Sequence, residues 1–84
     1  MIDQVLRSGT SIGANVTEAG SAQSKKDFAH KMHIAFKEAN ETRYWLELLV
    51  ASETISQKTA DGLLNDITEL IKLLASILKT SNQK

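Results

Sequence analysis

Residues 25–51 of the 84-residue chain read KKDFAHKMHIAFKEANETRYWLELLVA, and this stretch decides the fold. Its core-type residues recur at strict intervals of four and three, the spacing of a helix face that packs nearly parallel to its neighbours. Ser24 and Asp27 resemble the capping box with which many helices begin. The spacing predicts a helix over residues 25–51 with the following core-facing seam: Phe28, Met32, Ala35, Ala39, Thr42, Leu46 and Leu49.

The segments on either side predict two further helices, over about residues 2–19 and 57–80. The first has a narrow apolar stripe and is expected to end at Gly20. The third is expected to begin near Ser56, and its apolar stripe is wide enough to touch two neighbours. Because the connections are short, successive helices should run antiparallel. The predicted fold class is therefore all-α, an up-and-down antiparallel bundle of three long helices.

The composition bounds the size and setting of the protein. A chain of 84 residues predicts one domain, residues 1–84, with a core that is marginal alone. The chain has no cysteine, which leaves a partner chain as the expected source of extra stability. Ten basic and ten acidic side chains cancel, so only a local patch can attract nucleic acid. No signal-peptide pattern or membrane-length apolar stretch is visible, so we expect a cytoplasmic protein.

Two glycines, Gly9 and Gly13, lie within the apolar stripe of the first helix. Each costs about 1 kcal/mol relative to alanine inside a helix, so a compensating contact is expected. One interpretation is a close helix crossing, in which the missing side chains let two backbones approach. The alternative is a kink or break over residues 8–11, with two shorter helices in place of one.

A second line of side chains on the helix at 25–51 is turned away from its main seam and predicts a subunit interface. Three of its members are large apolar groups that need a cover, either from a further helix or from another subunit. Trp45 suits an interface anchor, and packing within the bundle is the alternative. The candidate interface residues are Ile34, Glu38, Glu41, Arg43, Trp45 and Leu48. Arg7 is expected either to pair with Glu38 or Glu41 or to be exposed.

Basic side chains gather at the start of the same helix. They are Lys25, Lys26, His30, Lys31, His33 and Lys37. Four of them share one face, so the stripe is a candidate contact for RNA phosphates, and a plain solvated face is the alternative. Asp27 and the two histidines do not predict a metal site, because the stripe faces away from the core where bundle metals bind. No nucleophile motif or phosphate-binding loop is present, so we expect no enzyme, cofactor or small-molecule substrate.

Several short stretches carry a family resemblance. They are RSGTSIGAN at residues 7–15 with Glu18, SKKDF at 24–28, KEA at 37–39 with Glu41, and YWL at 44–46. Together they resemble the 23S rRNA intervening-sequence proteins, with specific residues up to about residue 50 and a helical pattern to about 79. The resemblance implies a four-helix bundle that assembles as a homopentameric ring. Related bundles are accessory proteins of diversity-generating retroelements and associate with nucleic acid.

Family members carry one more helix before the segment that here begins at Met1. The resemblance therefore implies three of the four helices in this chain, which fits either a truncated reading frame or a short variant that borrows the missing contact from a neighbour. The expected function is that of a self-assembling, non-enzymatic bundle protein. An RNA-binding accessory protein that uses the basic stripe is the alternative.

Overall fold

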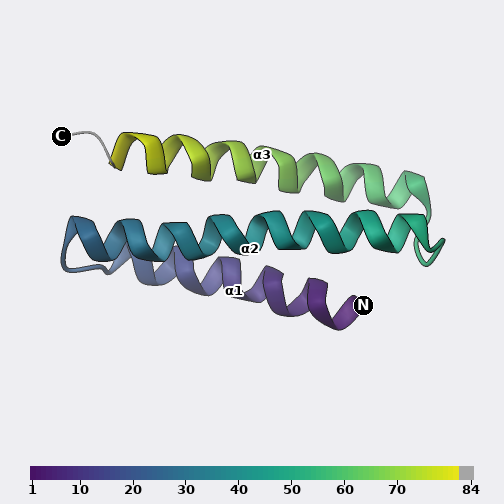
Figure 1. Ribbon diagram of the computed structural model, residues 1–84, viewed down its shortest axis with the longest axis horizontal. Helices are drawn as coiled ribbons and strands as arrows, with labels where there is room; N and C mark the ends of the chain where they lie inside the picture. Colours follow the sequence, from purple (N-terminus) through teal and green to yellow (C-terminus); the bar gives the residue numbers. More distant parts are fainter. Residues whose placement is uncertain (82–84) are drawn as a thin grey trace.

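The computed structural model describes residues 1–81, and three α-helices account for nearly all of them (Figure 1). Helix α1 spans Ile2–Gly20, α2 spans Lys25–Ala51 and α3 spans Gln57–Ser81. Successive helices run antiparallel, so the predicted all-α up-and-down bundle is confirmed (Figure 1). The predicted helix bounds are correct to within one residue at each end. Residues 82–84 of the predicted domain lie outside the described residues.

Helices α2 and α3 begin with serine caps, as their sequences predict. The Asp27 amide donates a hydrogen bond to Ser24 Oγ at 3.0 Å, and the Thr59 amide donates one to Ser56 Oγ at 3.1 Å. Each bond satisfies an amide that has no partner within the first turn of a helix. The two caps fix where the connections end and the long helices start.

The backbone at the end of α1 differs from expectation, and the connection after α2 contains a left-handed residue. Helix α1 stops at Gly20 as predicted, but no described glycine has a positive φ, so Gly20 does not provide the usual left-handed cap. The amides of Ser21 and Ala22 instead donate to the carbonyls of Glu18 and Ala19. The left-handed residue is Glu53, with φ of 59°, in the connection between α2 and α3.

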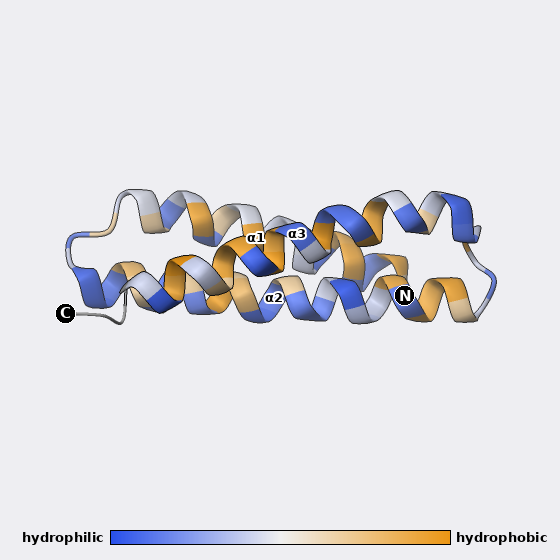
Figure 2. Ribbon diagram, turned by 90° about the horizontal axis from the view of Figure 1, so that it is seen from above, coloured by the Kyte–Doolittle hydropathy of each residue, from blue (hydrophilic) through white to orange (hydrophobic). Residues whose placement is uncertain are grey.

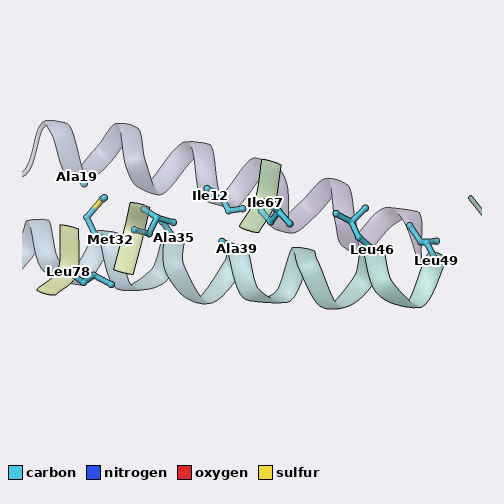
Figure 3. Close-up of a cluster of buried hydrophobic side chains, with 10 residues drawn as sticks. Ile12, Ala19, Met32, Ala35, Ala39, Leu46, Leu49, Ile67 and Leu78 are labelled. Atoms are coloured by element: carbon cyan, nitrogen blue, oxygen red, sulfur yellow. The ribbon is translucent and has the colours of Figure 1, made fainter. Parts of the chain in front are cut away.

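Helix α2 is the central element of the molecule, because it lies between α1 and α3 and contacts both of them (Figure 1). Figure 2 shows the same three helices from above, coloured by hydropathy. Among the described residues, no Cα atom of α1 lies within 8 Å of a Cα atom of α3. The predicted seam of α2 is buried except for Phe28, which is half-buried. A continuous core results, shown in Figure 3, and its members are Ile12, Ala19, Met32, Ala35, Ala39, Leu46, Leu49, Ile67, Leu74 and Leu78.

Candidate functional site

Helices α1 and α2 are joined by a buried hydrogen bond between Ser8 and Thr42. Both residues are buried, and their hydroxyl oxygens lie 2.7 Å apart. Each hydroxyl has a single proton, so one donates across this pair while the other donates to a carbonyl of its own helix, Gln4 O or Glu38 O. Two side chains this short can touch only where the backbones are close. This contact is therefore the close crossing of α1 within the chain.

The predicted close crossing at Gly9 and Gly13 is wrong for contacts within this chain. No neighbouring heavy atom lies within 4 Å of a Cβ placed on either glycine. The alternative, a break over residues 8–11, is also wrong, because α1 is continuous from Ile2 to Gly20. The apolar stripe of α1 in fact divides in two, and α2 covers only the part that includes Ser8, Ile12 and Ala19. These three residues recur at intervals of four and seven, which places them on one side of the helix, and this spacing in the sequence could have identified the covered face.

The other part of the α1 stripe borders an open groove, which we call the α1–α3 groove. Its volume is about 260 Å³, its floor comes from Thr42 and Leu46 of α2, and Asp66 is its one charged lining residue. The walls come from α1 and α3, and their lining residues are Val5, Gly9, Leu63, Ile67 and Leu70. Helices α1 and α3 both lie beside α2, and the groove is the space between them.

Two regular seams border this groove and are only partly covered within the chain. The α1 seam repeats with four-three spacing and consists of Ile2, Leu6, Gly9, Gly13 and Val16. The α3 seam has the complementary three-four spacing and consists of Leu63, Asp66, Leu70, Leu73 and Ile77. Gly9 of the α1 seam lines the groove, and so do Leu63, Asp66 and Leu70 of the α3 seam. Leu6 is 63% exposed, Leu63 47% and Leu73 57%, although each side chain is large and apolar. Helix faces with this spacing usually pack on another helix. The exposed side chains of these two seams have no such neighbouring helix within residues 1–81.

The acidic residues of the candidate interface make contacts within the chain. Arg7 lies 3.5 Å from Glu38 Oε2 and 2.9 Å from Glu41 Oε1, so the expected pairing is confirmed. Glu38 is buried, but the Arg7 side chain is 58% exposed, which limits this ion pair to about 0–1 kcal/mol. Its main effect is to fix the register of α1 on α2.

The apolar members of the candidate interface are less accessible than expected. Ile34, Trp45 and Leu48 are each half-buried, so this line is already partly covered within the single chain, and its need for a further cover stays a prediction. The physical reason is that α1 lies over this flank of α2, held there by Arg7, while the Tyr44 ring packs edge-on to Trp45 with centroids 5.2 Å apart. Surplus apolar surface does exist, but it lies along the α1–α3 groove.

Two further details of the candidate interface concern polar groups. Arg43 Nη2 lies 3.5 Å from Asn40 Oδ1, within α2 itself. Trp45 Nε1 is buried without a hydrogen-bond partner, and so is Gln4 Oε1. The register that pairs Ser8 with Thr42 places Gln4 at about the level of Trp45 and Leu46. A role of the six residues in a subunit contact stays a prediction.

The basic stripe is exposed except at one position. Lys25, Lys26, His30, His33 and Lys37 are all exposed. Lys31 is half-buried, and its Nζ lies 2.8 Å from Glu18 Oε1 of α1. This ion pair removes one positive charge from the stripe and ties the start of α2 to the end of α1. A contact with RNA phosphates stays a prediction. Within residues 1–81, no group of three His, Cys, Asp or Glu side chains is placed to bind a metal ion.

The Lys31 amine offers a direct test of the ion pair. The hydrogen bond to Glu18, followed by the attraction of its charge, raises the pKa of Lys31 above the ordinary 10.5. The contribution of the pair to stability is therefore present below the ordinary pKa and is lost as pH rises through the raised value. An NMR titration of the Lys31 side chain should show the raised pKa, and Glu18→Gln should lower it. Glu41→Gln, which affects the Arg7 pair instead, should leave the titration unchanged.

The fold and the surfaces define a class: an all-α helical bundle with large apolar side chains exposed on two of its helices. Residues 1–76 match the sequence pattern of the 23S rRNA-intervening sequence protein family, and the chain belongs to that family. The resemblance inferred from its short motifs is thereby confirmed. No helix in residues 1–81 has both the length and the apolar character needed to cross a bilayer.

A solved structure gives the second comparison. It is a crystal structure of a protein with unknown function from the S23 ribosomal protein family of Bacteroides thetaiotaomicron. The two chains are 58% identical, the TM-score is 0.89, and the alignment covers 92% of this chain and 71% of the other. A comparison with curated proteins gives no match. The identity and TM-score together show that the two proteins share this helical fold.

Proposed function

We propose that this chain is a non-enzymatic helical-bundle protein that works by assembling with further copies of itself. The observation that carries the proposal is the set of large apolar side chains left exposed on α1 and α3 on either side of the apolar α1–α3 groove. Large apolar side chains at helical spacing, exposed along two neighbouring helices, are typical of surfaces that bind another protein. The RNA-binding alternative gains no comparable observation among residues 1–81, where the basic stripe is exposed at five positions and paired with Glu18 at the sixth, Lys31.

The free energy gained by burying side chains exceeds the cost of association only if the contact runs along most of the groove. Fully burying one Leu, Ile or Val side chain contributes about 1.5–3 kcal/mol, and the groove side chains are already part-buried. Association costs about 4–15 kcal/mol before any contact is counted. One or two leucines cannot offset this cost, whereas both seams together can. The proposal therefore implies a partner surface that runs the length of α1.

The expectation of no enzymatic activity rests on the chemistry of the described side chains. Catalytic groups usually show strongly perturbed pKa values inside a cleft. Lys31, whose pKa is raised, forms a surface ion pair with Glu18 and does not line a cleft. The α1–α3 groove is apolar apart from Thr42 and Asp66, and it brings no acid and base together.

Light scattering of the purified chain tests self-assembly. We expect the wild type to have the mass of an oligomer and Leu6→Asp to have the mass of a single chain, because the change places a charge on the open α1 seam. Leu6 is exposed, so the substitution should leave the helical circular dichroism signal intact. Ala14→Asp adds the same charge on the far side of α1 and should keep the oligomer. A wild-type chain that stays monomeric at every concentration would exclude the proposal.

A further inference from the structure

We propose that one end of this bundle docks an acidic, amphipathic helical segment of a different protein. The docking surface, called here the α2–α3 basic face, has two rows of exposed lysines with apolar side chains between them. Lys26 and Lys37 form the row on α2, and Lys72 and Lys79 form the row on α3. Three observations support this docking: the separation of charge along the molecule, the position of the two rows, and the apolar side chains between the rows.

The charges of this net-neutral chain are separated along its length. The start of α2 and the end of α3 lie at the same end of the molecule (Figure 1). The half that contains this end, residues 12–37 and 70–81, carries six lysines and two acidic residues, and one of these acids, Glu18, is paired with Lys31. The other half, residues 1–11 and 38–69, carries three basic and eight acidic residues. An excess of positive charge at one end attracts a partner of the opposite sign to that end.

The two lysine rows lie on the side of the molecule away from the α1–α3 groove. On α3, the groove residues Leu63 and Leu70 are turned to one side of the buried Leu74, and helical spacing turns Lys72 and Lys79 to the other side. Both lysines are exposed.

The row on α2 is at the same level. Helix α2 ends at Ala51 and α3 begins at Gln57, and both rise about 1.5 Å per residue, so Lys72 lies at about the level of Phe36. Lys37 follows Phe36 directly on the exposed face of α2. A segment laid between the two helices would therefore meet lysines on both of its sides.

The side chains between the two rows are apolar. Helix α1 contacts α2 through Lys31 and Thr42, and helical spacing places Ala29 and Phe36 on the opposite flank, next to α3. Helix α3 contributes Ile71 and Ala75 to the same strip. Phe36 and Ile71 pack against the core and stay half-buried, while Ala75 is exposed and small enough to let another backbone approach.

This arrangement fits an acidic helix with one apolar side. Its apolar side would cover the strip, and carboxylates on both flanks would reach the lysine rows. From Lys26 to Lys37 the face is about 16 Å long, the length of a helix of about 11 residues.

The same features favour a protein segment over a nucleic acid. A phosphate backbone has no apolar side to match the strip between the rows. Proteins that bind single strands also stack bases on aromatic side chains, but the exposed Tyr44 lies in the acidic half of the molecule. A long backbone that continued along the bundle would be repelled by the eight acidic residues of that half. A short acidic segment avoids this repulsion.

Fluorescence anisotropy with a labelled synthetic peptide tests the docking. The probe is a helix-forming peptide of about 12 residues with leucine and alanine on one side and glutamate on both flanks. A scrambled peptide of the same composition should bind at least about tenfold more weakly, because its apolar side is lost. Lys72→Glu should weaken binding of the probe at least about fivefold. Lys58→Glu is the matched control, an exposed lysine of α3 in the acidic half, and it should leave the affinity unchanged.

A second pair of variants tests the apolar strip. Ala75→Asn places a polar group between the rows and should weaken the probe, whereas Ser76→Asn, on the neighbouring exposed position, should not. An RNA oligonucleotide of about 12 nucleotides is the competing probe. Tighter binding of this RNA than of the peptide, with the same loss in Lys72→Glu, would assign the face to nucleic acid and overturn the proposal. Equal binding of the two peptides, or no binding of either, would also overturn it. All four variants should keep the wild-type mass in light scattering, so this docking and self-assembly are tested separately.

Discussion

Leu74→Ala should lower the free energy of unfolding by about 2–5 kcal/mol, the range measured when a buried leucine is cut back and leaves a cavity. Leu74 is 1% exposed and belongs to the continuous core shared by the helices. Domains of this size are stable by only about 5–15 kcal/mol, so the variant should lose a large part of its stability. A urea titration followed by circular dichroism at 222 nm would measure the loss.

The residue immediately before Leu74 provides the matched control. Leu73 is chemically identical but 57% exposed, so Leu73→Ala should change the free energy of unfolding of the single chain by only about 0.5 kcal/mol or less. Both variants should be compared at a protein concentration where light scattering reports single chains. Equal losses for the two leucines would contradict the described rotation of α3 about its axis.

Ser8→Leu should cost about 1–3 kcal/mol or more, because it forces a large side chain into a buried contact between α1 and α2. Ser8 is fully buried, and its oxygen lies 2.7 Å from Thr42 Oγ1. The larger residue would also remove one hydroxyl from the pair that links the two helices. The expected result is a lower urea midpoint with an unchanged slope.

A leucine placed elsewhere on α1 shows whether the effect is local. Ala14 is exposed on the far side of α1, so Ala14→Leu should alter the free energy of unfolding by only about 0.5 kcal/mol. If Ser8→Leu were as stable as Ala14→Leu, the close crossing of α1 on α2 would be refuted. The pair also tests the division of the α1 stripe into a covered and an open face.

The helices themselves could be predicted because their signals are local. The four-three spacing of the seam from Phe28 to Leu49 fixes the main face of α2, and Ser24 and Ser56 mark where helices begin. The contact of Arg7 with Glu38 and Glu41 also followed, since a long basic side chain on a packed helix reaches acids on its neighbour. Each of these inferences depends on the sequence of a single helix or on one pair of adjacent helices.

The location of the open surface could not be predicted, because it depends on which helix covers which face. The sequence shows that Trp45 and Leu48 leave the main seam of α2, but it does not show that α1 lies over that flank. Periodicity alone likewise does not divide the α1 stripe. The same spacing is compatible with Gly9 or Ser8 at the crossing, and the backbone arrangement places Ser8 there.

The lack of contact between α1 and α3 also affects how the fold comes apart. Either outer helix can detach from α2 while the close backbone packing of the other on α2 is kept. The chain therefore resembles two helical hairpins that share α2. A partner helix bound in the α1–α3 groove would contact both outer helices and join the two hairpins into a single cooperative unit. Association would then slow the opening of both outer helices together. Helix α3 would contact the partner helix through a different face from the one that packs on α2.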